Sequence, residues 1–257
     1  MQDDRFLSQL RVEFLDAAGD QLDGLEATLN AALDGRRTGR EALRDVRRSA
    51  HTLKGTAGSL GFPLAGAIAH RLEDYLCDAD ELDPALSRGI MVFCDRIREI
   101  AAAGREPSDG DAVQLVRGLP VRWDPGSEEI EALDVEVLLA SPSRVASKIV
   151  RNTLQNCGYR VAYAETALDV FTLALQIRPD AMILAQTLDQ LSGAELARAF
   201  KAMSSTAAVP IGLLTSFGPD HAAFQELPDG VQLVRTGRAY FDDDMGGFLT
   251  RLQANLA

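Results

Sequence analysis

Residues 50–61 read Ala-His-Thr-Leu-Lys-Gly-Thr-Ala-Gly-Ser-Leu-Gly, and this stretch determines how the first part of the chain is interpreted. Apolar residues in and just before it recur at intervals of three and four, the spacing of one buried face of an α-helix. They are Val46, Ala50, Leu53, Ala57 and Leu60. At about 100° per residue, His51 lies roughly 140° from the centre of that face. The helix is therefore expected to expose the His51 imidazole to solvent.

The expected neighbours of this imidazole on the helix surface are cations and glycines. They are Arg44, Arg47, Arg48, Lys54, Gly55 and Gly58. A glycine inside a helix costs roughly 1 kcal/mol relative to alanine, so two glycines beside one histidine lower stability and leave only space. Such space suits a bulky group on a ring nitrogen, or a second protein docked over it. Lys54 lies one turn further on and could neutralise an anion held there.

A neutral imidazole is a good nucleophile near pH 7, so the chemistry that fits is phosphoryl transfer through N-phosphohistidine. A simpler alternative is a solvated histidine beside glycines that allow close helix packing. The longer match favours the first interpretation. His-Thr-Leu-Lys-Gly-Thr-Ala-Gly-Ser-Leu-Gly resembles the phosphoacceptor motif of histidine phosphotransfer (Hpt) domains, including the related domain of chemotaxis kinases. The resemblance covers roughly residues 1–104 and implies a four-helix bundle in which His51 is phosphorylated.

Composition limits the class of protein. The chain has 257 residues, a length that suits two domains of ordinary size. Its net charge of −12 argues against general nucleic-acid binding and against anionic membrane surfaces. The three cysteines have no paired or metal-type spacing, which suggests reduced thiols. No apolar run is long enough to span a bilayer, and the N-terminus does not resemble a signal peptide, so a cytoplasmic location is expected.

Helical periods predict an antiparallel bundle in the first part of the chain. The expected segments are 3–18, 22–35, 41–60, 64–79 and 84–104. In the fourth segment, His70 is expected to be structural or solvated, and the acids near it are expected to form a solvated face. These acids are Glu73, Asp74, Asp78, Asp80 and Glu81. Residues 105–133 carry glycine, proline and charge and are expected to form a partly ordered linker, with Trp123 packing onto one of the two domains.

From residue 134 onward, short apolar runs alternate with helical periods. Strands are expected at 135–140, 159–163, 181–185, 211–215 and 231–234. Helices are expected at 142–156, 167–177, 193–203 and 241–256. This alternation predicts a parallel sheet covered by helices on both faces. The fold class expected for the whole chain is thus α plus α/β.

The order and lengths of these elements resemble the receiver domain of response regulators, with its flavodoxin-like sheet. The resemblance covers about residues 134–257 and is also carried by Ser192-Gly193-Ala194-Glu195, in the place of the family's Gly-Xaa-Glu segment. Thr215 matches the family's hydroxyl residue after the fourth strand. The family's Lys-Pro after the fifth strand corresponds to Arg235-Thr236 or to Thr236-Gly237.

The acidic residues of the receiver family are missing. Ala140 and Ser141 stand where the first strand would supply metal ligands, and Ala185 stands at the phosphoacceptor position. Asp189, four residues beyond that position, is expected to point elsewhere. Without carboxylates there is no site for Mg²⁺, a hard cation that prefers oxygen ligands. The expected domain is therefore a pseudo-receiver that binds a partner or pairs with a second copy.

Together these features predict a phosphorelay protein with an Hpt bundle at 1–104, a linker at 105–133 and a pseudo-receiver at 134–257. His51 would accept and donate the phosphoryl group, Lys54 would neutralise its oxygens, and Gly55 and Gly58 would leave space. Three arginines on the same helix, Arg44, Arg47 and Arg48, would support docking.

The expected partners are a sensor histidine kinase and a response-regulator receiver domain, with neither nucleic acid nor membrane. No cofactor is expected, because the chain has no Gly-rich nucleotide loop and Mg²⁺ would belong to the partner. Two alternatives stay open. The chain could be a non-catalytic scaffold that sequesters a receiver or a kinase through the Hpt surface. It could also be a phosphatase, which would need an amide or acid that orients water.

Overall fold

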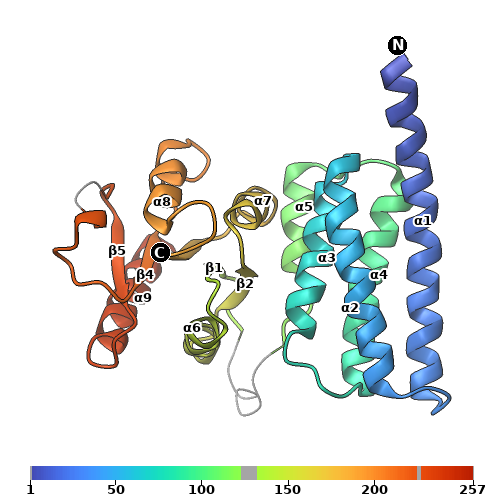
Figure 1. Cartoon of the computed structure of the whole chain (residues 1–257), viewed down its shortest axis with the longest axis horizontal. Helices are drawn as coiled ribbons and strands as arrows, with labels where there is room; N and C mark the ends of the chain where they lie inside the picture. The colour runs from blue at the N-terminus through green and yellow to red at the C-terminus, as the bar shows by residue number, and fades with distance from the viewer. Residues whose placement is uncertain (1, 123–131, 225–226, 257) are drawn as a thin grey trace. The chain divides into compact units, whose positions relative to one another are not determined.

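The computed structural model describes residues 2–122, 132–224 and 227–256, and the chain divides into two compact units (Figure 1). The first unit is Met1–Arg122 and the second is Trp123–Ala257. Trp123, for which packing onto a domain was expected, lies outside the described residues. None of the helices in the described ranges is both long enough and apolar enough to cross a lipid bilayer.

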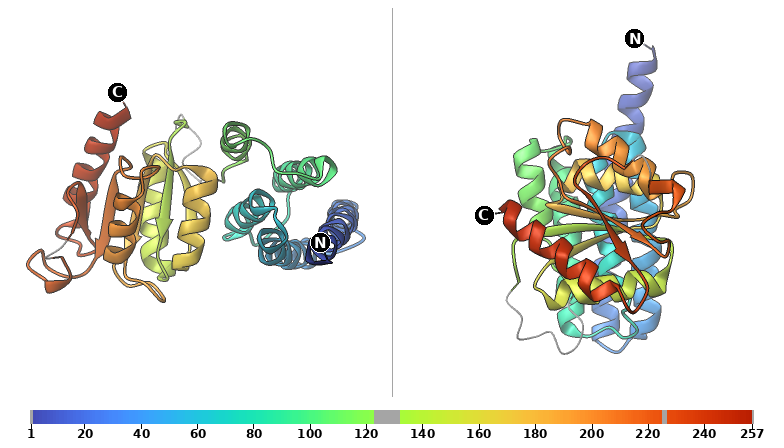
Figure 2. Two further views of the ribbon diagram at one scale, coloured as in Figure 1. Left: turned by 90° about the horizontal axis from the view of Figure 1, so that it is seen from above. Right: turned by 90° about the vertical axis from the view of Figure 1, so that its left-hand side faces the viewer.

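The first unit is built from helices, seen end-on in Figure 2. They are α1 (Gln2–Leu33), α2 (Gly39–Ala57), the 3-10 turn η1 (Gly58–Leu60), α3 (Pro63–Leu76), α4 (Pro84–Ala103) and α5 (Asp109–Arg117). Helices α1 to α4 form an antiparallel four-helix bundle in which α1 packs on α2 and α4, and α3 packs on the same two helices. The predicted bundle is confirmed.

Helix α1 is one continuous helix of 32 residues, so the prediction of two helices at 3–18 and 22–35 is wrong. The reason is that its apolar stripe keeps the helical period across the supposed break. The buried residues of this stripe are Phe14, Ala18, Leu22, Leu25 and Leu29. Gly19 interrupts the sequence, but a single glycine lowers helix stability without ending the helix.

Helix α2 has well-defined ends. Thr38 caps its N-terminus in a capping box, in which the Thr38 hydroxyl accepts from the backbone N–H of Glu41 and the Glu41 side chain accepts from the backbone of Thr38. Beyond η1, Gly61 adopts a left-handed conformation with φ of 90°, and Pro63 opens α3. The predicted apolar face is buried at Val46, Ala50, Leu53 and Ala57 and half-buried at Leu60, which orients the opposite face of α2 towards solvent.

Part of the segment expected to be a linker is folded. It contains α5, and both Val116 and Leu119 are fully buried. The carboxylate of Glu106 accepts a hydrogen bond of 3.2 Å from the backbone N–H of Leu64 at the start of α3. Burial raises the pKa of Glu106 although these backbone hydrogen bonds act in the opposite direction. The first unit thus extends to Arg122, since the short apolar run of this segment is the buried face of a helix.

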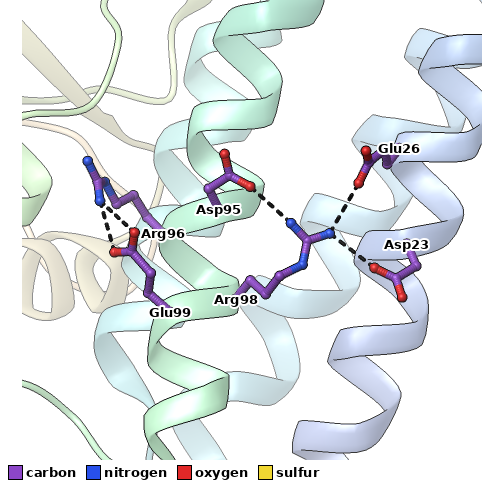
Figure 3. A network of polar contacts seen from close by, with 6 residues as sticks. All are labelled: Asp23, Glu26, Asp95, Arg96, Arg98 and Glu99. Atoms are coloured by element: carbon purple, nitrogen blue, oxygen red, sulfur yellow. Dashed lines mark hydrogen bonds and ion pairs between the residues drawn. The ribbon is translucent and has the colours of Figure 1, made fainter.

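Surface ion pairs connect α4 to α1 (Figure 3). The guanidinium of Arg98 lies 3.1 Å from Oδ1 of Asp23 and 3.5 Å from Oε2 of Glu26, both on α1, and 2.9 Å from Asp95 on α4. The hydrogen bond to Asp23 raises the pKa of Arg98. These side chains are largely exposed, so each pair stabilises the bundle by less than about 1 kcal/mol, and buried apolar faces dominate its stability.

The second unit is a five-stranded parallel sheet. Its strands are β1 (Glu136–Ala140), β2 (Arg160–Ala164), β3 (Ala181–Ala185), β4 (Ile211–Thr215) and β5 (Val231–Arg235). The helices of this unit are α6 (Arg144–Asn156), α7 (Ala167–Ile177), α8 (Gly193–Ala202) and α9 (Phe241–Leu256). A 3-10 turn, η2 (Ala222–Phe224), lies between β4 and β5. The strand order is β2-β1-β3-β4-β5, the flavodoxin-like order. The predicted α/β fold is confirmed, because each expected strand and helix is present.

Helices cover both faces of this sheet, with α6 and α9 on one face and α7 and α8 on the other (Figure 1). The three central strands are fully buried, as continuous apolar strands of a parallel sheet should be. Residues 186–192 connect β3 to α8, and a Cβ on Gly193, the first residue of α8, would lie 2.3 Å from the carbonyl oxygen of Ala185. Glycine is therefore required at residue 193 for this close approach.

Candidate functional site

The exposure predicted for His51 is confirmed. It lies on α2 with 80% of its side chain accessible to solvent. His70, on α3, is buried. Of the two interpretations of His70, a structural residue or a solvated one, the structural one is therefore favoured. An accessible imidazole on a rigid helix is free to meet a second protein, whereas a buried one is not.

A carboxylate from a neighbouring helix orients the His51 ring. Nδ1 of His51 lies 3.0 Å from Oε1 of Glu73 on α3, and the other oxygen, Oε2, lies 3.5 Å from Nζ of Lys54. A carboxylate only accepts hydrogen bonds, so Nδ1 carries the proton of the neutral ring and Nε2 carries the lone pair. The lone pair that is available to a second molecule is therefore on Nε2.

The interpretation of Glu73 as part of a solvated face is wrong. Its side chain is 25% exposed and bridges His51 and Lys54. Helices α2 and α3 pack side by side, which brings residues 22 positions apart into contact. Spacing along one helix cannot reveal a partner on another helix, so sequence reasoning missed this residue. The one signal in the sequence was the position of Glu73, an acid one turn from His70 on the helix that follows the His51 motif.

The side-chain positions of the two glycines beside His51 are open. A Cβ on Gly55 or Gly58 would meet no described atom within 4 Å, and both glycines are exposed. Gly66 on α3 differs, because its Cβ would lie 3.6 Å from the Cβ of Ala57 on α2. Close packing between α2 and α3 therefore involves Gly66, while Gly55 and Gly58 leave open surface one and two turns beyond His51.

The three arginines expected to support docking differ in their surroundings. Arg44 and Arg48 are exposed, and Arg48 forms an ion pair with Asp45. Arg47 is half-buried, and its guanidinium donates to the carbonyl oxygens of Leu76, at 2.8 Å, and of Ala79. Leu76 is the last residue of α3 and Ala79 lies in the connection to α4, so Arg47 holds this connection against α2. Its contacts are those of a structural residue.

The second unit presents small, neutral side chains where the receiver family has acids. Ala140 ends β1 and Ala185 ends the adjacent β3, at the carboxyl edge of the sheet. Ser141 is buried, and its Oγ accepts a hydrogen bond from the backbone N–H of Ser143. Within the described ranges, no group of three or more His, Cys, Asp or Glu side chains could hold a metal ion.

Two other residues of this edge are engaged locally. The Asp189 carboxylate accepts a hydrogen bond of 2.9 Å from the backbone N–H of Ala167, at the start of α7. Backbone hydrogen bonds from Ala167 and Gln190 lower the pKa of Asp189. The hydroxyl of Thr215 accepts from the backbone N–H of Phe217, and the backbone N–H of Thr236 donates to the carbonyl of Thr215. Asp189 is thus directed to the α7 N-terminus.

Residues 9–119 match the sequence profile of the Hpt domain family. This unit is an Hpt domain. The match extends through α5, consistent with the folded unit ending at Arg122. No curated protein matches the chain.

Solved structures similar to the chain include a response regulator, the receiver domain of a sensor kinase and a sensor protein. The chemotaxis response regulator CheY4 of Vibrio cholerae is 22% identical, with a TM-score of 0.40, over 46% of this chain and 98% of that one. The receiver domain of a sensor histidine kinase from Pseudomonas aeruginosa, with magnesium coordinated in its active-site cleft, is 19% identical, with a TM-score of 0.41, over 46% and 98%. A sensor protein from Polaromonas is 17% identical, with a TM-score of 0.41, over 48% and 98%.

The fold of the second unit is assigned from its strand order rather than from these similarities. An Hpt domain joined to a receiver-type fold is the composition of a two-component phosphorelay protein. Its partners are accordingly two-component proteins such as kinases and response regulators.

Proposed function

We propose that this chain is a cytoplasmic phosphorelay intermediate without kinase activity of its own. His51 accepts a phosphoryl group from a sensor histidine kinase or a receiver aspartate and donates it to a response-regulator receiver domain. The observation that carries the proposal is the arrangement of His51, Glu73 and Lys54. It provides an exposed nucleophile, a carboxylate that fixes its tautomer, and a cation beside it.

The transfer follows from this geometry. The Nε2 lone pair attacks the phosphorus of an aspartyl phosphate on the partner, an N–P bond forms, and the P–O bond to the aspartate breaks. The aspartate leaves as a free carboxylate, so no proton is needed for its departure. The ring keeps its Nδ1 proton, and Glu73 stabilises the positive charge that develops on the imidazole. The reverse sequence returns the phosphoryl group to a receiver.

Lys54 neutralises the phosphoryl oxygens. Its ammonium lies 3.5 Å from Glu73 and one helical turn from His51, within reach of a group on Nε2. The chain itself supplies no cofactor in this proposal, and the Mg²⁺ that assists phosphoryl transfer is held by the partner's acidic site. Gly55 and Gly58 leave the surface open for that site to approach.

Docking involves Arg44 and Arg48, which are exposed on the same helix as His51. A receiver active site is acidic, so exposed cations around the histidine would favour association with it. The contacts of Arg47 support a structural role instead. The net charge of −12 disfavours nucleic acid or an anionic membrane as a partner.

The second unit is proposed to be a pseudo-receiver that takes up no phosphoryl group. The support is chemical: Ala185 has no carboxylate to phosphorylate, and Ala140 and Ser141 cannot hold a hard dication. Asp189 is engaged with the N-terminus of α7. The surface of this unit would serve a partner protein or a second copy of the chain.

The test is phosphoryl transfer to the full chain from a panel of phosphorylated receivers. His51→Gln is expected to abolish labelling without unfolding the bundle, because the side chain is on the surface. His221→Gln is the matched control, since His221 is also exposed, and its labelling should equal that of the unmodified chain. Acid-labile phosphate retained in His51→Gln would overturn the proposal. Receiver binding without any transfer would instead support the scaffold alternative.

A further inference from the structure

A cavity of about 790 Å³ lies at the carboxyl edge of the sheet in the second unit. Its floor includes Ala185 and Leu214, at the ends of β3 and β4. Its walls come from α6, which contributes Val145 and Ile149, and from Phe217 in the segment after β4. Cavities of this volume are typical of sites for small organic ligands, which range over about 300–1,000 Å³.

The cavity lies at the sheet edge where the receiver family carries its acids, and its lining includes the small residues Ser141 and Ala185. In open α/β sheets, ligands bind in the crevice outside the carboxyl ends of the strands. Here Ala185 and Ser141 place short side chains on the floor of that crevice. Small neutral groups leave volume there and carry no charge that would favour an ion. The crevice thus occupies the usual position of a binding site in such a sheet, and its lining is mainly apolar.

The side chains of the walls are large, apolar and accessible. The exposed fractions are 73% for Val145, 51% for Ile149 and 37% for Phe217. Phe217 is held by stacking on His221, with 4.1 Å between the ring centroids. Such accessible apolar groups gather around the cavity, where a bound apolar molecule would remove them from water.

Polar groups in the lining are mostly uncharged. Hydroxyls come from six serine and threonine side chains, among them Ser141, Thr215 and Thr236, and the charged residues are Arg238 and Asp242, which are exposed and opposite in sign. Among the residues that the structure describes, Oε1 of Gln186 has no hydrogen-bond partner. A buried acceptor without a donor is unfavourable, so a donor brought by a ligand would stabilise the complex once the amide turns towards it.

We propose that this cavity binds a small, uncharged, predominantly apolar organic molecule that carries a hydrogen-bond donor. The apolar walls bind the body of the molecule, and the hydroxyls and the Gln186 amide orient its polar group. This binding is independent of His51 and is a function of the second unit additional to phosphotransfer.

The test uses N-phenyl-1-naphthylamine, a neutral aromatic probe with one N–H donor whose fluorescence rises in apolar surroundings. Titrated into the full chain, it is expected to bind saturably with one site per chain. Ile149→Asp places a carboxylate on the wall and should weaken binding by at least about tenfold, because the charge must be desolvated beside an apolar ligand. Leu168→Asp is the matched control, since Leu168 is 75% exposed on α7 and outside the lining.

Circular dichroism and thermal unfolding establish that the variants are folded. Phe217→Ala serves as a second variant if Ile149→Asp is not folded, and it should also weaken binding because it removes part of a wall. Inorganic phosphate with Mg²⁺ should not displace the probe. Absent or unsaturable binding to the unmodified chain, equal weakening in Ile149→Asp and Leu168→Asp, or displacement by phosphate would overturn the proposal.

Discussion

Glu73 on α3 lies 3.0 Å from Nδ1 of His51 on α2, so the proposed nucleophile and the residue that orients it come from different helices. This contact depends on the close packing of α2 against α3, where Gly66 approaches Ala57. The packing of the bundle thereby also sets the surroundings of the His51 ring. It fixes the tautomer that leaves Nε2 free to attack, and it holds Lys54 against the same carboxylate.

Replacing Glu73 should slow transfer without preventing it. In Glu73→Ala the ring can rotate and exchange tautomers, so we expect the transfer rate to fall by about tenfold to a hundredfold, or roughly 1.4–2.8 kcal/mol in activation free energy. Glu73→Gln should recover part of the rate, because its amide oxygen can still accept from Nδ1. The measurement is single-turnover transfer from a phosphorylated receiver. Glu81→Ala, an exposed acid on the connection after α3, is the control and should transfer normally. Equal rates for Glu73→Ala and the unmodified chain would exclude an orienting role.

Lys54→Ala should slow transfer while leaving stability nearly unchanged. The side chain is 27% exposed, and a surface lysine adds little to folding free energy. In the transition state, however, it meets a phosphoryl group that carries close to two negative charges. Transfer rates and urea unfolding midpoints separate the two effects. Lys148→Ala, an exposed lysine on α6, is the matched control. An unchanged rate in Lys54→Ala would mean that another group neutralises the oxygens.

Arg44 and Arg47 should give opposite results although they are close in sequence. Arg47→Ala removes hydrogen bonds to the carbonyls of Leu76 and Ala79 and should lower the free energy of unfolding by about 1–3 kcal/mol. Arg44→Ala should change it by less than about 0.5 kcal/mol, because the side chain is exposed.

For affinity towards a receiver domain, Arg44→Ala should have the larger effect and Arg47→Ala the smaller one. Arg44→Ala should weaken association, and added salt should reduce this difference, since the Debye length is only about 8 Å at physiological ionic strength. Unfolding curves and receiver affinities for the two variants at low and high salt provide the check. If Arg47→Ala is as stable as the unmodified chain but binds the receiver much more weakly, Arg47 has a docking role rather than a structural one.

The sequence predicted the exposed histidine and most of the element boundaries because both depend on local periodicity. Strands β3 and β4 have the predicted bounds, since each is a short apolar run flanked by polar residues. The contacts of Glu73 and Arg47 could not be predicted, because both are made between elements. The cavity beside Ile149 likewise depends on how α6 lies over the strand ends. Helix α1 was wrongly predicted as two helices, whereas its buried stripe continues from Phe14 through Ala18 and Leu22 to Leu29.

Acid should destabilise the second unit partly through Asp244 on α9. Its carboxylate accepts from Nε and Nη2 of Arg235 on β5, at 2.7 and 2.8 Å, and this side-chain hydrogen bonding lowers the pKa of Asp244. A lowered folded-state pKa gives stability that is complete above the unfolded value, about 3.9, and that is lost as pH falls through the lower folded value. Thermal unfolding of Asp244→Asn should therefore show a loss of stability at pH 7 that shrinks towards pH 3. Asp242→Asn, an exposed neighbour on the same helix, should lack this pH dependence.

The second unit should take up no phosphoryl group even when a donor is abundant. The experiment uses the full chain carrying His51→Gln, so that the Hpt site cannot contribute, incubated with acetyl phosphate and Mg²⁺. Its mass should be unchanged, because Ala185 offers no carboxylate and the Asp189 carboxylate is held by the backbone N–H of Ala167. An active receiver domain treated in parallel establishes that the donor works. A stoichiometric phosphate adduct on Asp189 would show that the third strand is aligned wrongly with the receiver family and that this unit is an active receiver.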